Sequence, residues 1–267
     1  MDGTTGVIEQ DLITRDEVIA AFAPVKLTER AFDSPLSPAE LSHSQSGLPV
    51  FWQANGPAVP EMTAQRRLSL AVKRACDVIG ASLGLFALAP LLVITAVCIK
   101  MTDRGPVFFR QARVGQNGKS FAIFKFRSMY WDRCDISGVA QTVSNDHRVT
   151  PIGAFIRKTS IDELPQLINV LSGDMSLVGP RPHVRGMLAA GKPYEELAPH
   201  YDFRHSMRPG LTGWAQCNGL RGPTVERSKA LRRIGHDIAY VQNFSLWLDL
   251  RILVKTITSE LLSSTAH

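Results

Sequence analysis

The stretch VIGASLGLFALAPLLVITAVCI, from Val78 to Ile99, has twenty-two consecutive residues without a charge. About 20 apolar residues are enough for a helix to span a bilayer, so the stretch predicts a membrane anchor. Gly80 and Gly84 loosen its first half, because glycine is a poor helix former. An ordinary spanning helix and a buried core helix remain alternatives to a bent membrane segment.

The flanks of this stretch predict how it meets the membrane. Basic residues stand at both ends, with Lys73 and Arg74 before it and Lys100 and Arg104 after it. Basic flanks favour the cytoplasm, so both are satisfied if the segment enters and leaves by the same face. Pro90 removes a backbone donor near the centre and would mark the bend. We therefore expect residues 66–104 to form a re-entrant helix-break-helix.

Composition limits the remaining possibilities. The 267 residues suffice for one domain with a substantial core and an appendage. The four cysteines are widely separated and form no Cys-x-x-Cys pair, which argues against a zinc site and favours free thiols in a reducing compartment. The N-terminus is acidic and lacks an early apolar run, so no signal peptide is expected.

Charge is distributed unevenly along the chain. Residues 1–65 carry nine acidic and three basic residues, a net charge of −6, and six prolines among Ser, Gly and Ala. We expect this head to be largely disordered. The remaining residues carry a net charge of +12, which favours anionic partners such as phosphates, anionic lipid or nucleic acid.

Two adjacent carboxylates, Asp162 and Glu163, lie where a helix should begin. Ser160 and Glu163 have the spacing of a capping box, which would place Asp162 in the first helical turn and keep it ionised beside the helix dipole. The same residues also suit a purely structural helix cap. Pro165 prefers the first helical position, so the helix could start one turn later. Basic residues upstream, Arg157 among them, suit phosphate chemistry.

A β-hairpin is predicted after the apolar stretch. Residues 107–114 and 120–127 are rich in Phe, Val and Ile, and Gly115-Gln116-Asn117-Gly118 forms a turn between them. Alternation puts Lys125 and Arg127 on one face of the second strand, where two cations could bind a diphosphate. A solvated basic face is the simpler alternative. Further helices are expected at residues 152–156, 164–171, 225–242 and 244–262; the last could lie at a membrane surface or pack on the core.

Seven ordered motifs resemble the bacterial sugar transferases, also called polyprenyl-phosphate hexose-1-phosphate transferases or monotopic phosphoglycosyl transferases. The resemblance runs from about Arg67 to about Thr258, and the acidic head lies outside it. The motifs are Lys73 to Asp77, Gly105 to Gln111, Lys125 to Met129, Thr159 to Gln166, Gly173 to Pro182, Arg208 to Gln216, and Asn243 to Asp249.

The resemblance implies roles for particular residues. Asp162 corresponds to the family's nucleophile, and Glu163, with Asp162, to the site that holds Mg2+. The family's re-entrant helix breaks at Ser-Pro, whereas this chain has Ala89-Pro90. The phosphate-binding residues that the resemblance implies are Lys125, Arg127, Arg157, Pro180, Arg181, Pro182, Arg221 and Asp237.

The implied reaction is transfer of a hexose-1-phosphate from a UDP-sugar, glucose or galactose, to undecaprenyl phosphate with release of UMP. This would be the first membrane step of an exopolysaccharide repeat unit. The implied fold is α/β and α-rich: a catalytic domain at residues 105–267 with a short hairpin and amphipathic helices, anchored monotopically at the cytoplasmic face of the bacterial inner membrane. The expected partners then include inner-membrane lipid and exclude nucleic acid. A homodimer is possible on this resemblance.

Two functions from other classes are alternatives to sugar-phosphate transfer. A nucleic-acid-binding protein would explain the isoelectric point near 9.3 but not the apolar stretch, and no recognition motif is visible. A membrane scaffold would explain residues 78–99 and the acidic head but has no need of Lys125, Asp162 and Arg181. Salt-sensitive retention on DNA, or polysaccharide output indifferent to Asp162→Asn, would favour these alternatives.

Overall fold

The computed structural model describes residues 60–134, 146–198 and 200–262. Contacts divide the chain into Met1–Gly56 and Pro57–His267, and every described residue belongs to the second unit. The predicted disorder of the acidic head therefore falls almost wholly outside the described residues. Within them the architecture is helix-rich with a few short strands, as the sequence predicts.

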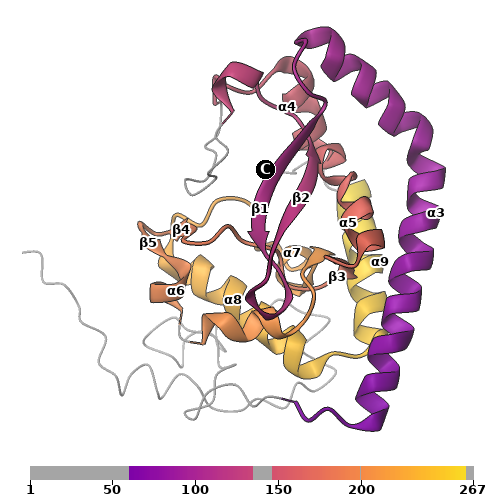
Figure 1. Ribbon diagram of the computed structural model, residues 1–267. Helices are drawn as coiled ribbons and strands as arrows, with labels where there is room; N and C mark the ends of the chain where they lie inside the picture. Colours follow the sequence, from indigo (N-terminus) through magenta and orange to yellow (C-terminus); the bar gives the residue numbers. More distant parts are fainter. Residues whose placement is uncertain (1–59, 135–145, 199, 263–267) are drawn as a thin grey trace, which may run out of the picture. The chain divides into compact units, whose positions relative to one another are not determined.

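Helix α3 (Ala64–Thr102) contains the apolar stretch and is by far the longest element described. Figure 1 shows it running up one side of the structure and bending over the end of the β-hairpin. Helical geometry continues through Pro90, so the expected pair of helices with a break between them is instead one bent helix. Its bounds lie within two residues of the expected anchor, and its re-entry into a membrane stays a prediction.

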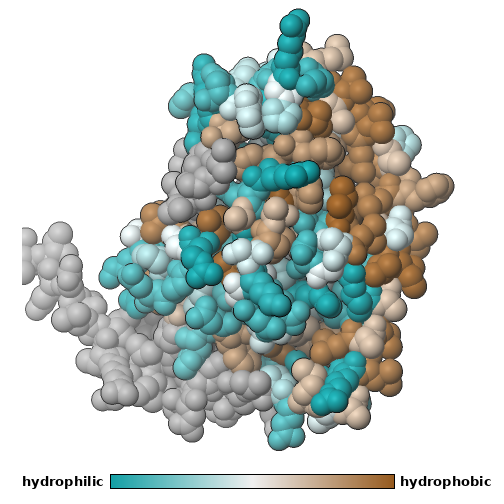
Figure 2. Space-filling model, in the orientation of Figure 1, coloured by the Kyte–Doolittle hydropathy of each residue, from teal (hydrophilic) through white to brown (hydrophobic). Residues whose placement is uncertain are grey.

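One face of α3 packs against the rest of the chain. Ala81 joins Ile123, Leu167 and Val170 in one buried cluster, and Ile99 joins two residues, Phe126 and Ile156, in another. The opposite face is exposed; Phe86 is 84% accessible. In the most apolar 18-residue window, only 11% is buried, which excludes a core helix. Figure 2 shows this exposed apolar surface as the brown area over α3. The helix is long and apolar enough to cross a membrane, which is consistent with membrane association.

The two glycines of α3 serve packing. A Cβ atom on Gly80 would lie 2.7 Å from Leu177 Cδ1, and one on Gly84 would lie 3.3 Å from Leu167 Cδ1. A side chain at Gly80 would force the Leu177 side chain to move, and one at Gly84 would require Leu167 to shift by a few tenths of an ångström. Their role is thus to seat the helix on β3 and α5.

The predicted hairpin is confirmed. Strands β1 (Phe108–Val114) and β2 (Ser120–Phe126) pair antiparallel, with Phe109 opposite Lys125 and Arg113 opposite Phe121. The turn between them contains Asn117 at φ 55°, a left-handed conformation that Asn tolerates well. Because directly opposed residues project to the same face, Arg113 and Lys125 share one face of the hairpin.

Short elements follow the hairpin and carry the carboxylate pair. Helix α4 (Pro151–Lys158) starts with the Thr150 side chain accepting a hydrogen bond from Gly153 N, and a 3-10 turn, η4 (Ile161–Glu163), leads into α5 (Gln166–Ser172). Gly173 ends α5 in the left-handed region at φ 92°. Strand β3 (Ser176–Val178) then pairs in parallel with β6 (Gly210–Thr212).

Several further elements complete the described part of the fold. They are β4 (Leu188–Ala189), β5 (Lys192–Pro193), α6 (Tyr194–Leu197), the 3-10 segments η2 (Gln116–Gly118), η3 (Trp131–Arg133) and η5 (Tyr201–Ser206), and helices α7 (Trp214–Cys217), α8 (Arg227–Asn243) and α9 (Leu246–Leu262). The predicted helices near 225–242 and 244–262 are confirmed as α8 and α9. Leu248 and Ile252 of α9 are buried whereas Trp247 and Val254 are exposed, so one face of α9 packs on the core and another does not.

Candidate active site

The carboxylate pair sits in a tight turn rather than in a capped helix. Ser160 adopts the left-handed conformation at φ 56° and makes no side-chain capping bond, so the capping-box prediction is wrong. Helix α5 begins three residues after Glu163, which agrees with the later start that Pro165 suggests. Between α4 and α5 the chain instead forms the 3-10 turn η4, which contains both carboxylates.

Glu163 is the hub of a charge network. Its Oε1 accepts hydrogen bonds from Lys125 Nζ at 2.7 Å and from Arg181 Nη2, and its Oε2 accepts one from Arg181 Nη1 at 3.0 Å. Burial raises the pKa of Glu163, but Arg181 and Lys125 outweigh it and hold that pKa well below its usual range. Three segments distant in sequence therefore meet at one ionised carboxylate.

Asp162 differs from its neighbour in having no partner. Its carboxylate makes no hydrogen bond or ion pair with any residue that the structure describes. The side chain is partly exposed, yet burial raises its pKa to about 6, with Lys125, Arg157 and Arg181 opposing the rise and Glu163 adding to it. The expectation that a helix dipole keeps Asp162 ionised is corrected: nearby cations favour the carboxylate.

The turn that carries Arg181 is held through its carbonyl groups. Gly210 N donates to Pro180 O at 2.9 Å, and Arg113 Nη1 donates to Pro182 O at 3.4 Å. Both prolines lack a backbone donor, so carbonyl oxygens are the atoms by which the structure grips this turn. Pro180 and Pro182 thus shape the backbone beneath Arg181.

Further cations face the pair. Arg113 and Arg221 interact electrostatically with Arg181 and Glu163, and Arg157 with Asp162. The buried Arg113 Nε has no hydrogen-bond partner, and burial together with Arg181 lowers the pKa of Arg113 to about 10. Sequence reasoning missed Arg113, although strand alternation and the register opposite β2 place it on the same face as Lys125.

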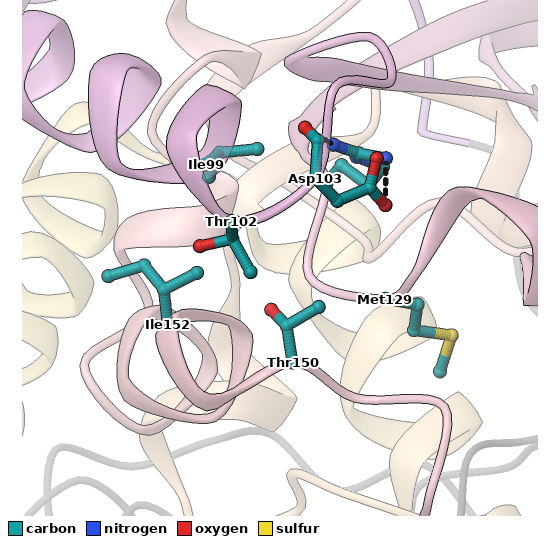
Figure 3. A pocket seen from close by; sticks show the side chains of 7 residues that line it. Ile99, Thr102, Asp103, Met129, Thr150 and Ile152 are labelled. Carbon is teal, nitrogen blue, oxygen red and sulfur yellow. Dashed lines mark hydrogen bonds and ion pairs between the residues drawn. The ribbon is translucent and has the colours of Figure 1, made fainter.

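Arg127 lies elsewhere, which corrects its predicted place beside Lys125. Its side chain is buried, with Nη1 donating to Asp103 Oδ2 at 2.7 Å, because β2 ends at Phe126 and the next side chain turns to the end of α3. Figure 3 shows Asp103 with its dashed contact, beside Ile99 and Thr102. The hollow at this point leaves no space for a water molecule, so it is not a substrate pocket.

Asp237 does not contact the carboxylate pair directly. It lies buried on α8 and accepts hydrogen bonds from Arg204 Nε at 3.0 Å and Nη2 at 2.6 Å. Arg204 Nη2 also donates to the carbonyl of Arg181. Asp237 therefore reaches the centre through Arg204, a residue that sequence reasoning missed because its neighbours in the chain carry no motif.

The donor chemistry at the turn fits Mg2+. Mg2+ in phosphoryl-transfer sites is bound by one or two carboxylates, with substrate phosphates and water completing its shell. Asp162 offers an unpartnered carboxylate beside Glu163. The described residues contain no cluster of three His, Cys, Asp or Glu side chains, so an all-protein cage is absent from this part of the chain.

Comparisons with known proteins agree with the resemblance. The sequence profile of a family described as "Bacterial sugar transferase" matches residues 68–263. An exopolysaccharide production protein of Rhizobium leguminosarum bv. phaseoli is 55% identical over 194 residues, covering 73% of this chain and 97% of that protein. UDP-glucose:undecaprenyl-phosphate glucose-1-phosphate transferases of Caulobacter vibrioides and Escherichia coli (strain K12) are 48% and 43% identical, each over 73% of this chain. The chain spans 72% of the first and 41% of the second.

Proposed function

Because this chain belongs to the bacterial sugar transferase family, we propose that it transfers a hexose-1-phosphate from a UDP-sugar to undecaprenyl phosphate and releases UMP. The observation that carries the proposal is the unpartnered carboxylate of Asp162 beside the Glu163–Lys125–Arg181 network. A nucleophile must be free to attack, and the cations beside it must meet a phosphate. The unpartnered carboxylate and the cations meet where η4, β2 and the turn at Arg181 come together.

The reaction proceeds in two displacements at one phosphorus atom. A carboxylate oxygen of Asp162 attacks the phosphorus that bears the sugar, and the bond from that phosphorus to the bridging oxygen breaks. UMP leaves with that oxygen and the electron pair, and a hexosyl acyl phosphate remains on Asp162. A phosphate oxygen of undecaprenyl phosphate then attacks the same phosphorus and regenerates the carboxylate. Splitting one transfer into two in this way is nucleophilic catalysis.

Cations of the site stabilise the charge that develops during these steps. Arg181 and Lys125 are bonded to Glu163 and lie beside Asp162, so they are already oriented when phosphoryl oxygens arrive. Preorganised charges of this kind supply a large share of transition-state stabilisation. Glu163 and Asp162 would hold Mg2+, which would neutralise charge on the diphosphate. Three further arginines add positive charge near the two carboxylates: Arg113, Arg157 and Arg221.

The lipid acceptor explains why the enzyme carries an anchor. The exposed apolar face of α3 would lie in the inner membrane and bring the turn at Asp162 to the cytoplasmic headgroup level, where a phosphate on a lipid is found. We propose that α3 re-enters rather than spans, because Lys73 and Lys100 flank it with the same charge. The sugar is proposed to be glucose, since several relatives are named as UDP-glucose transferases.

The test is a UMP-release assay with undecaprenyl phosphate, Mg2+ and a panel of UDP-sugars. UDP-glucose should be preferred, and EDTA should abolish release until Mg2+ is restored. Intact-protein mass after incubation with UDP-glucose and Mg2+, without lipid, should increase by a hexose phosphate on the Asp162 peptide. Absence of that adduct, together with intersecting initial-rate lines, would mean direct transfer through a ternary complex.

A further inference from the structure

We infer that Arg204, held by Asp237, is a positioning residue that fixes the Pro180-Arg181-Pro182 turn and so directs the Arg181 side chain toward the reacting phosphoryl group. The inference rests on the proposed function, because it assigns Arg181 to that reaction. It concerns a residue outside every motif of the sequence. It also gives Asp237 a task different from direct phosphate binding.

The contacts form one continuous path. Asp237 Oδ2 accepts two hydrogen bonds from the Arg204 guanidinium, and Arg204 Nη2 donates onward to Arg181 O. The Arg181 side chain in turn binds Glu163, next to Asp162. The path therefore runs from Asp237 on helix α8, through Arg204 and Arg181, to Glu163 beside the nucleophile.

Burial excludes direct contact of this pair with substrate. The Arg204 and Asp237 side chains are 1% and 2% exposed, and Tyr201 OH occupies the remaining Nη1 of Arg204 at 3.4 Å. Buried ion pairs are often no more stabilising than apolar residues of the same volume, because desolvating two charges is costly. A specific geometric requirement explains such a pair better than stability does.

That requirement lies in the turn itself. A Pro-Arg-Pro sequence offers a single backbone N–H, so its backbone must be gripped through carbonyl oxygens. Pro180 O and Pro182 O are bonded to Gly210 N and Arg113 Nη1, on either side of Arg181 O. Arg204 supplies the central contact, on the residue whose side chain matters. Losing it would free the peptide from which the Arg181 side chain projects.

The experiment is a double-mutant cycle in the full chain purified in detergent. Arg204→Lys keeps the charge, but its single nitrogen ends one bond short of the position of Nη2, the atom that binds both Asp237 and Arg181 O. The Nε contact to Asp237 is lost as well, so the grip on Arg181 O should weaken. We expect it to lower kcat for UMP release about 10- to 100-fold with KM for the UDP-sugar changed less than about threefold. In an Arg181→Ala background, the same substitution should change the rate less than about threefold, because the side chain that Arg204 positions is already gone.

A matched control uses another arginine–aspartate pair. Arg127 binds Asp103 at 2.7 Å, at the end of α3, and makes no contact with the backbone of Arg181 in the part of the chain that the structure describes, so Arg127→Lys weakens a comparable ion pair outside the path. Any effect it has on rate should multiply with that of Arg181→Ala. If Arg204→Lys also multiplies with Arg181→Ala, or raises KM alone, the positioning role is refuted.

Hydrogen exchange decides the inference even without catalysis. Amides of residues 176–187 should exchange faster in Arg204→Lys and in Asp237→Asn, and should be unchanged in Arg127→Lys. Unchanged exchange in the first two variants would refute the inference. A wild-type chain that releases no UMP would refute only the proposed function. The exchange measurement would still test whether Arg204 and Asp237 fix the turn at Arg181.

Discussion

Neighbouring carboxylates should respond to neutralisation with opposite changes in stability. Asp162→Asn removes a charge that has no partner, whereas Glu163→Gln removes one bonded to Lys125 and Arg181. The two substitutions change the same number of atoms in adjacent residues. Each is therefore the control for the other.

The expected magnitudes follow from the surroundings. Burial raises the pKa of Asp162 from 3.8 to about 6, and at about 1.4 kcal/mol per unit this is an upper bound of about 3 kcal/mol opposing folding at pH 7. Partial exposure of the side chain reduces it, so we expect Asp162→Asn to stabilise the fold by about 1–2 kcal/mol. Glu163→Gln should destabilise by about 2 kcal/mol or more, because two partly buried cations lose their partner.

The assay is thermal unfolding in detergent with EDTA at pH 7, followed by activity with Mg2+. For a chain of this size, 1 kcal/mol shifts Tm by about 2–4 °C, so Asp162→Asn should unfold about 2–8 °C higher than wild type. Its UMP release should nevertheless fall at least ~10³-fold, like other lost nucleophiles. This is a trade of stability for activity. A lower Tm for Asp162→Asn would refute the reasoning, since it would mean that Asp162 has a stabilising partner.

Three further outcomes test other parts of the structure. Cysteine labels in the head and just after Lys100 should both be shielded from a membrane-impermeant reagent in intact cells; a head reached from outside would establish a spanning helix. Deleting residues 1–60 should leave specific activity in detergent within several-fold, and complete loss in a folded protein would contradict this. Backbone N–H groups of Trp131 and Gly105, then Arg127, lower the pKa of Asp103 to about 2, so its stabilisation is present above pH 4 and lost toward pH 2. Asp103→Asn should therefore lower Tm at pH 7, with the difference from wild type narrowing below pH 4; a constant difference would exclude the ion pair as its cause.

Local pattern determined much of this protein without any coordinates. The uncharged run from Val78 to Ile99 predicts the anchor helix, and alternation with a Gly-rich turn predicts the hairpin that the structure confirms. These features depend on backbone periodicity and on residues a few positions apart, which the sequence displays directly. The ordered motifs likewise suffice for the family, and they bring attention to Asp162 and Glu163 before any contact is known.

Tertiary structure alone decided which groups meet. Arg127 and Lys125 are two positions apart, yet the first binds Asp103 at the end of α3 and the second binds Glu163. Arg204 carries no sequence signal, but the fold places its guanidinium beneath the backbone of Arg181. The partner of each side chain depends on segments that are far away in the sequence and close in space. Burial and these partners together shift the pKa of each carboxylate. Motifs in the sequence therefore identify the candidate site residues, while long-range packing determines which of them contact one another.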